Sequence, residues 1–218
     1  MALKSGSERG KRGNLETSAI ILAGGRSLRL GYNKVLEMVG NRSLLELVIS
    51  CVASLSSEII VVTTEEQMIP KFEDYPDMHV VTDIYPGKGP LGGIYTGLKT
   101  STSACNLVVA ADMPFLNRAL LVYMLGMVDG VDLVAPRIEG QVEPLHAVYM
   151  RGCLAAIEKM MKEGVLGVHK LFSRVHVRYI EADEIARFDP EQRSLFNINT
   201  EGDLQMARKI TSRNRNND

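Results

Sequence analysis

The chain has 218 residues, of which 45% are hydrophobic and 23% are charged, and its formal net charge is −1. This composition excludes a wholly disordered chain and suffices for one sizeable domain without disulfide staples. The balanced charge excludes an overall basic surface that would hold nucleic acid or an anionic membrane.

Short apolar runs alternate with longer segments in which apolar residues recur at helical spacing. Strands are expected at residues 18–22, 58–63, 79–82, 106–111, 132–135, 144–150 and 175–180, and helices at 43–55, 93–100, 117–127, 151–163 and 200–210. The first helix begins with Ser43 and has Glu46 three residues later, the pattern of a capping box. Alternating strands and helices with continuously apolar strands predict an α/β fold, with a mostly parallel sheet covered by helices on both faces.

The two ends of the chain are polar. We therefore expect a flexible leader at residues 1–17, a single domain at 18–210 and a flexible tail at 211–218. The three cysteines are widely separated and form no C-x-x-C pair, which argues against a disulfide framework or a zinc site. No apolar run reaches the ~18 residues of a membrane span, and the leader lacks the apolar core of a signal peptide. A reducing cytoplasm is the expected location.

A glycine-containing loop, LAGGRSLRLGYNK, follows the first expected strand at residues 22–34. Gly24 and Gly25 allow a tight turn whose backbone amides approach a phosphate. Arg29 and Lys34 add cations that bind phosphate oxygens. The loop does not fit the P-loop pattern. The alternative is a tight turn beside two surface cations.

A second loop, GKGPLGG at residues 87–93, contains G-x-G-x-x-G, and Asp112 lies twenty residues beyond Gly92. A dinucleotide-binding fingerprint such as that for NAD is therefore an alternative. Two features argue against it. Residues 83–86 separate the loop from the preceding strand, and Pro90 has no amide hydrogen to offer a pyrophosphate.

Polar side chains follow the ends of the later strands. Asp112 ends an apolar strand and either ligates Mg²⁺, pairs with a cation or caps the next helix. Asp83 ends another strand, where it either contacts a nucleotide or initiates a turn. In FNINT, an extended backbone would direct Asn197 and Asn199 to one face, while Thr200 also suits a helix cap with Asp203.

Four motifs in order resemble those of the molybdenum cofactor guanylyltransferases, which belong to the nucleotidyltransferases with a Rossmann-like fold. The motifs are LAGG-x-S-x-R-L-G-x-x-K at 22–34, V-x-D with G-P-L-G-G at 81–93, A-D-M-P-F at 111–115, and F-N-I-N-T with D-L at 196–204. The resemblance spans residues 18–210. Where the family can place an asparagine at the end of the second strand, this chain has Val62 or Thr63.

The resemblance implies transfer of GMP from GTP to the molybdopterin form of the molybdenum cofactor, with release of pyrophosphate. It implies Mg²⁺ as cofactor, and cofactor-synthesis proteins or acceptor molybdoenzymes as further candidate partners. Carried over to this sequence, it places Leu22, Ala23 and Gly24 at the guanosine and Gly25 at the phosphates. It places Arg29 and Lys34 at the triphosphate, and Asp83 at the nucleotide. Asp112 would hold Mg²⁺, and Asn197 and Asn199 would lie at the acceptor phosphate. His146 opens an expected strand and either faces the pterin or is structural.

Two alternative functions stay open at this stage. The first is another nucleotidyltransferase of the same fold, which would transfer a cytidylyl group to the pterin or use a sugar phosphate as acceptor. The second is a non-catalytic nucleotide-binding protein, which the full set of candidate cations and carboxylates disfavours.

Overall fold

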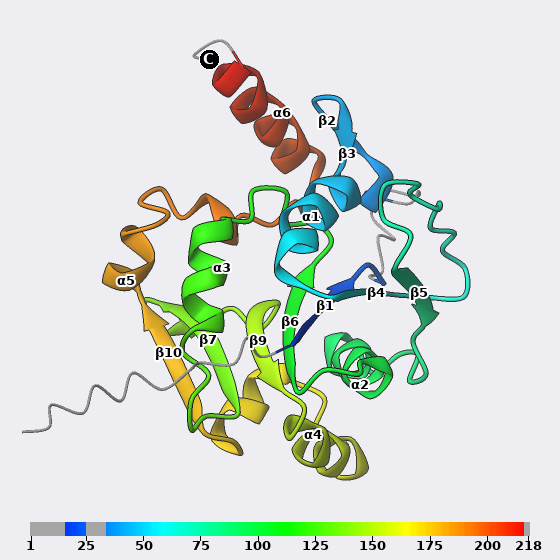
Figure 1. Cartoon of the computed structure of the whole chain (residues 1–218), viewed down its shortest axis with the longest axis vertical. Helices are drawn as coiled ribbons and strands as arrows, with labels where there is room; N and C mark the ends of the chain where they lie inside the picture. The colour runs from blue at the N-terminus through cyan, green and yellow to red at the C-terminus, as the bar shows by residue number, and fades with distance from the viewer. Residues whose placement is uncertain (1–15, 25–33, 216–218) are drawn as a thin grey trace, which may run out of the picture.

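The computed structural model describes residues 16–24 and 34–215, and its centre is a mixed β-sheet (Figure 1). The strands are β1 (Thr17–Leu22), β4 (Glu58–Thr63), β5 (Met78–Thr82), β6 (Cys105–Ala110), β7 (Leu133–Ile138), β8 (Gln141–Val142), β9 (His146–Met150) and β10 (Val177–Glu181). They form one eight-stranded sheet in the order β10-β7-β9-β6-β1-β4-β5, with β8 paired to β7. A separate hairpin joins β2 (Met38–Val39) to β3 (Arg42–Ser43).

Most strand pairs are parallel, as the sequence predicts. β1 pairs in parallel with both β4 and β6, β4 with β5, and β7 with β10. β9 is the exception, because it runs antiparallel to both β6 and β7. β6 therefore has a parallel neighbour on one side and an antiparallel neighbour on the other.

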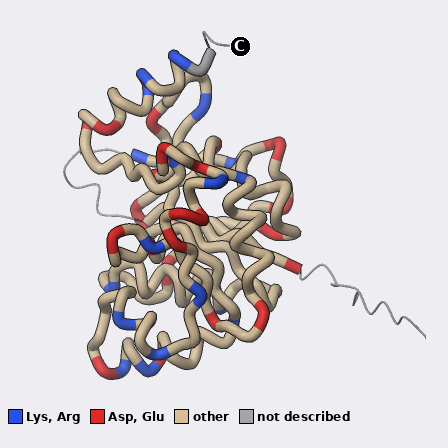
Figure 2. The backbone as a smooth tube through the Cα atoms, turned by 90° about the vertical axis from the view of Figure 1, so that its left-hand side faces the viewer, with Lys and Arg blue, Asp and Glu red and all other residues tan. Residues whose placement is uncertain are grey.

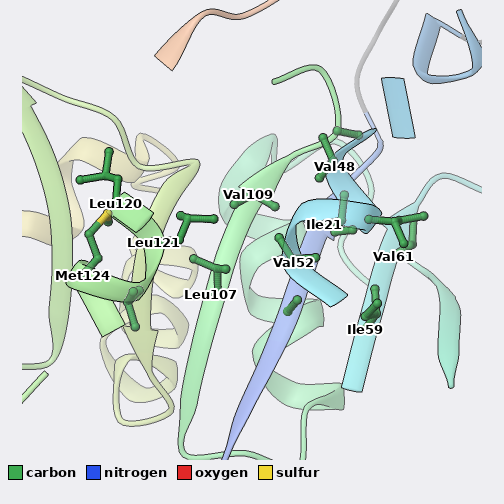
Figure 3. Packing of buried hydrophobic residues seen from close by; sticks show 14 of the residues in the cluster. Ile21, Val48, Val52, Ile59, Val61, Leu107, Val109, Leu120, Leu121 and Met124 are labelled. Carbon is green, nitrogen blue, oxygen red and sulfur yellow. The ribbon is translucent and has the colours of Figure 1, made fainter. Parts of the chain in front are cut away.

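Helices cover both faces of this sheet (Figure 1). They are α1 (Leu44–Val52), α2 (Pro90–Thr100), α3 (Arg118–Leu125), α4 (Cys153–Lys162), α5 (Ala182–Ala186) and α6 (Glu201–Arg215), with 3₁₀ turns η1 (Lys34–Leu36), η2 (Ala53–Leu55), η3 (Val168–Ser173) and η4 (Arg193–Leu195). One buried cluster packs α1, α3 and α5 on one face, as Figure 3 shows for Val48, Val52 and Leu121. A second cluster packs α2, α4 and η3 on the other face. The α/β fold with two covered faces is confirmed.

The helix boundaries differ from the prediction in two places. α2 begins at Pro90, three residues before the expected start, because proline suits the first helical position and Gly89 precedes it with a φ of 62°. α6 continues to Arg215, beyond the expected end of the helix at residue 210. Within this last part of α6, the Thr211 hydroxyl donates to the Ala207 carbonyl at 3.1 Å. Near the start of α6, the buried residues Leu204 and Ala207 pack against Val39 of β2.

The expected leader falls mostly outside the described residues, since residues 1–15 are not among them. Thr17, its last residue, is instead the first residue of β1 and pairs with Cys105. The hairpin β2–β3 and helix α5 had not been expected. Within the described residues, no helix combines the length and apolarity that a membrane crossing requires.

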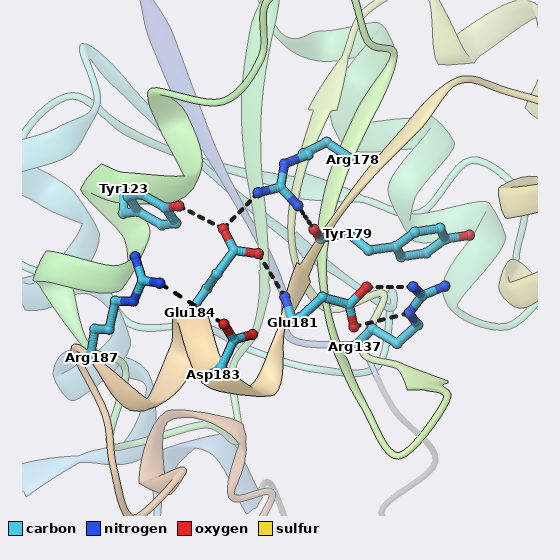
Figure 4. A network of polar contacts seen from close by, with 8 residues as sticks. All are labelled: Tyr123, Arg137, Arg178, Tyr179, Glu181, Asp183, Glu184 and Arg187. Atoms are coloured by element: carbon cyan, nitrogen blue, oxygen red, sulfur yellow. Dashed lines mark hydrogen bonds and ion pairs between the residues drawn. The ribbon is translucent and has the colours of Figure 1, made fainter.

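An ion-pair network anchors α5 to the β10 edge of the sheet (Figure 4). Glu184 accepts hydrogen bonds from the Tyr123 hydroxyl and from Arg178, both at 2.6 Å. On the neighbouring strand, Arg137 pairs with Glu181 and its guanidinium lies 4.0 Å from the centre of the Tyr179 ring. These contacts hold the short α5 and the end of β7 in fixed positions.

The packing of α2 on β1 predicts a strong effect of adding one methyl group. A Cβ at Gly97 would lie 2.3 Å from Cγ2 of Ile20, whose side chain is fully buried. We expect Gly97→Ala to lower the free energy of unfolding by about 1–3 kcal/mol despite the better helix propensity of alanine. At Gly202 in α6 the nearest atom would be 3.5 Å away, so Gly202→Ala should leave stability unchanged or slightly raised. Urea unfolding of both variants is the measurement, and a Gly97→Ala protein as stable as wild type would contradict the tight packing.

Candidate functional site

The predicted site residues gather at the carboxyl ends of the parallel strands. At the end of β1, the amides of Ala23 and Gly24 donate to the Val62 carbonyl at 2.8 and 3.1 Å. At the end of β5, the Asp83 amide donates to the Thr63 carbonyl at 2.8 Å. These bonds join the loops after β1, β4 and β5 at one edge of the sheet, where ligands bind in folds of this kind.

Lys34 and Asp112 form an ion pair at the centre of this edge. Lys34 Nζ lies 2.9 Å from Asp112 Oδ2, and the two side chains are 9% and 26% exposed. Of the possibilities left open for Asp112, the structure therefore shows the pairing with a cation. The cap of α3 is instead Asn117, which accepts from the Leu120 amide at 3.0 Å. A lysine this buried needs its partner, because an unpaired charge out of water is costly.

Of the two candidate cations in the first glycine loop, Lys34 is the one whose position the structure describes. The predicted phosphate ligands Gly25 and Arg29 lie outside the described residues. Figure 2 shows Lys and Arg interspersed with Asp and Glu along the rest of the chain. The charge of the site therefore depends on local groups and not on the field of a whole face.

Asp83 takes the turn geometry that the sequence allowed. Its Oδ1 accepts from the Tyr85 amide at 2.9 Å and from the Thr96 hydroxyl at 2.8 Å. The bond from Thr96 fixes the residues that follow β5 against the middle of α2. The loop connects β5, an edge strand, to α2. The dinucleotide fingerprint requires a glycine loop directly after the first strand of its unit, so this position argues against it.

The FNINT segment is attached directly to Asp112. The Ile198 amide donates to the Asp112 carbonyl at 3.0 Å, and the Ile198 side chain is fully buried. Asn197 is half-buried and Asn199 is exposed, in the alternation expected for an extended segment. The helix-cap alternative also holds, because Asp203 Oδ2 accepts from the amides of Asn199 and Thr200 at 2.9 and 2.8 Å. The bond from the Asn199 amide is the main reason that the pKa of Asp203 is lowered.

The sequence analysis missed Glu143 as a site residue. It follows β8, and its Oε1 accepts from the Leu145 amide at 3.0 Å. Burial raises its pKa, and the charge of Asp112 adds to this effect. The Leu145 amide and the nearby Asn197 side chain favour the charged form of this carboxyl and so act to lower its pKa. In the sequence, Glu143 stands directly before Pro144 and Leu145 at the start of an apolar strand. The prediction named the strand there and no role for Glu143.

The donor set fits a divalent cation that is held mainly by a ligand. Within residues 16–24 and 34–215, no group of three or more His, Cys, Asp or Glu side chains could enclose a metal ion. Mg²⁺ typically takes one or two carboxylates and completes its shell with phosphate oxygens and water. Asp112, partly exposed at the edge of the sheet, can supply such a carboxylate.

His146 lies in the protein core, as expected for a structural residue. It is fully buried in β9, and in the described structure neither ring nitrogen has a hydrogen-bond partner. Burial lowers its pKa to about 4, although the nearby Asp189 carboxylate and the backbone of Ser194 oppose this change. The imidazole is therefore neutral at pH 7 and does not face solvent or an open site.

Known proteins are similar to this chain over most of its length. Residues 19–179 match the family model of the MobA-like NTP transferase domain. A probable molybdenum cofactor guanylyltransferase of Pelotomaculum thermopropionicum is 33% identical over 201 residues, which cover 92% of this chain and 96% of that relative. A molybdenum cofactor guanylyltransferase of Desulfosudis oleivorans is 32% identical over 194 residues, with 87% and 93% covered.

Solved structures share the fold. Molybdopterin-guanine dinucleotide biosynthesis protein A from Archaeoglobus fulgidus superposes with a TM-score of 0.77 at 27% identity, covering 90% of this chain and 99% of that one. 2-C-methyl-D-erythritol 4-phosphate cytidylyltransferase from Thermus thermophilus gives a TM-score of 0.70 at 19% identity, covering 91% and 100%. The second likeness shows the fold alone.

The buried His146 predicts a loss of stability in acid. Its pKa in the folded state is about 4, below its ordinary value of 6.5, so the unfolded chain binds more protons between these pH values. Stability should therefore fall as the pH drops through this window, by up to about 3 kcal/mol from this residue. In His146→Phe this contribution should vanish. Urea unfolding at several pH values measures both proteins, and identical pH slopes would contradict the assignment.

Proposed function

The chain belongs to the MobA-like NTP transferase family, and from this membership we propose that it transfers GMP from GTP to the molybdopterin form of the molybdenum cofactor. The products are the guanine dinucleotide form of the cofactor and pyrophosphate. The observation that carries the proposal is the Lys34–Asp112 pair at the end of β6, with the Asn197 segment bonded directly to it.

The nucleotide is proposed to bind on the β1–β4–β5 side of Asp112. The amides of Ala23 and Gly24 already donate to Val62, so this turn offers a base its carbonyl oxygens. Carbonyl oxygens accept from the ring N–H and amino group of guanine, which favours GTP over CTP. Leu22 packs beside this turn against Gly93, and Asp83 follows β5 and accepts from Thr96 of α2.

The acceptor is proposed to bind on the opposite side, where β9 reverses the direction of the sheet. Asn197 and Asn199 lie there, and their amides can both donate to and accept from a phosphate-bearing ligand. Arg29 and Gly25, from the first loop, are proposed to complete the contacts to the triphosphate.

Catalysis is proposed to rest on positioning and on charge. The terminal phosphate of the acceptor attacks the α-phosphorus in line with the departing pyrophosphate, and a phosphate dianion needs no strong base. Lys34 is held where it can stabilise negative charge that develops on the phosphates. Asp112 would hold a divalent cation, proposed to be Mg²⁺, which when bound neutralises phosphate charge.

Nucleotide binding is the first test of this proposal. We expect GTP with Mg²⁺ to raise the melting temperature, and we expect CTP, UTP, ATP and NAD⁺ to raise it much less. Ligand binding stabilises the folded state by mass action, so the size of the shift follows affinity. A preference for CTP would support cytidylyl transfer instead, and a shift with NAD⁺ alone would revive the second glycine loop as a dinucleotide site.

Substitution of the ion pair tests the catalytic roles. Asp112→Asn and Lys34→Met should each lower the rate of pyrophosphate release from GTP and molybdopterin by ~100-fold or more. Each leaves one charge unpaired and should also destabilise the protein. The double variant removes both charges, so it should recover stability but not turnover. Asp129→Asn, at an exposed position before β7, is the control. Near wild-type turnover in folded Asp112→Asn would contradict the assignment.

A further inference from the structure

A small cavity opens on the acceptor side of the site. Its volume is about 290 Å³, and its lining comes from the end of β7, the β7–β8 turn, Glu143 and Leu195 of η4. Ile138, Val142 and Leu195 are half-buried apolar side chains that contribute to its wall. A cavity of this volume is at the small end of the range for ligand sites, roughly 300 Å³, and suits one planar ring system.

Glu143 is held firmly at this cavity. Its amide donates to the Pro136 carbonyl at 3.1 Å, and its Oε1 accepts from the Leu145 amide at 3.0 Å. The following Pro144 carbonyl accepts from the Tyr149 hydroxyl at 2.9 Å. The Leu145 carbonyl accepts from the Ala110 amide at 3.0 Å, at the end of β6. The carboxylate is therefore fixed relative to the strand that carries Asp112.

The charge of Glu143 is not neutralised by any described Lys, Arg or His within ion-pair distance. It accepts a hydrogen bond from the Leu145 amide, and the Asn197 side chain lies nearby. Two carboxylate oxygens offer about four acceptor sites, so there is capacity for further donors. A half-buried carboxylate without a cationic partner, in a cavity with both polar and apolar lining, favours a ligand that brings such donors.

We propose that Glu143 determines the specificity for the acceptor by accepting hydrogen bonds from the ring N–H and amino group of its 2-amino-4-oxopyrimidine ring. This inference rests on the proposed function, because that function supplies a pterin acceptor. The apolar wall contacts the faces of the flat ring. Asn197, which lies near Glu143, precedes Ile198, whose amide donates to Asp112, so the ring site lies beside this segment.

The position of the cavity separates this ring from the guanine of GTP, which carries the same donor pair. The turns proposed for the nucleotide follow β1 and β5, whereas Glu143 follows β8 and precedes β9. In the sheet, β6 with Asp112 lies between these two groups of strands. The guanine of GTP and the ring of the acceptor are thus assigned to opposite sides of the Asp112 carboxylate.

The test uses the full chain and two simple ring probes. Pterin presents the donor pair, whereas lumazine carries an oxygen in place of the 2-amino group. We expect wild type to bind pterin at least about tenfold more tightly than lumazine, measured by ligand fluorescence and by saturation-transfer NMR. Glu143→Gln keeps an acceptor for the Leu145 amide but should abolish this discrimination. Glu163→Gln, on a glutamate paired with Arg174 outside the cavity lining, is the matched control.

Kinetics separate this inference from the proposed function. Glu143→Gln should raise KM for the molybdopterin acceptor about tenfold or more, with little change in kcat or in KM for GTP. Equal affinity for the two probes, or no pterin binding at the highest soluble concentration, would overturn the inference. So would a Glu143→Gln protein that loses GTP affinity or kcat alone, since the residue would then act at the phosphates. Discrimination between the probes in a protein without guanylyl transfer would overturn only the proposed function.

Discussion

The ion pair between Lys34 and Asp112 connects the loop after the first strand to the end of the central strand, and the other contacts of the site are arranged around it. Asp112 takes part through two groups, since its carboxylate meets Lys34 and its carbonyl accepts from Ile198. The ion pair is largely buried, so its geometry depends on close packing of the surrounding loops. Lys34, from the first quarter of the sequence, and Ile198, from the last quarter, thereby both contact Asp112.

The reversal of direction at β9 divides the edge of the sheet into two parts of different construction. On the β1 side, parallel strands end in turns whose backbone groups are largely bonded to one another. On the β9 side, a strand begins at this edge, and the turn before it brings Glu143 from the opposite direction. Under the proposed function, substitutions in the β7–β9 region would alter the acceptor side and leave the turns after β1 and β5 unchanged.

The sequence predicted the strands closely because buried apolar runs such as 58–63 have clear limits. The capping box of Ser43 and Glu46 was also predictable, since it depends on local residues alone. The direction of β9 was not, because periodicity does not encode whether a strand runs parallel to its neighbours. The contact between Glu143 and Asn197 follows from that direction, so it could not be read from spacing. Leu22, Ala23, Gly24, Asp83 and Asp112 do lie at the predicted edge, while their roles toward a nucleotide stay predictions.

The hydrogen bond between Ile198 and Asp112 also bears on how the protein is made. A ribosome releases the chain from its N-terminus, and domains generally fold as units once enough of the chain has emerged. The turn after β1, Lys34 and Asp112 leave the ribosome long before the FNINT segment does. A nascent chain can therefore assemble the parallel strands while the segment that closes the site is still being synthesised. A polypeptide interrupted before residue 196 would therefore carry Lys34, Asp112 and Glu143 but lack the segment that is bonded to Asp112.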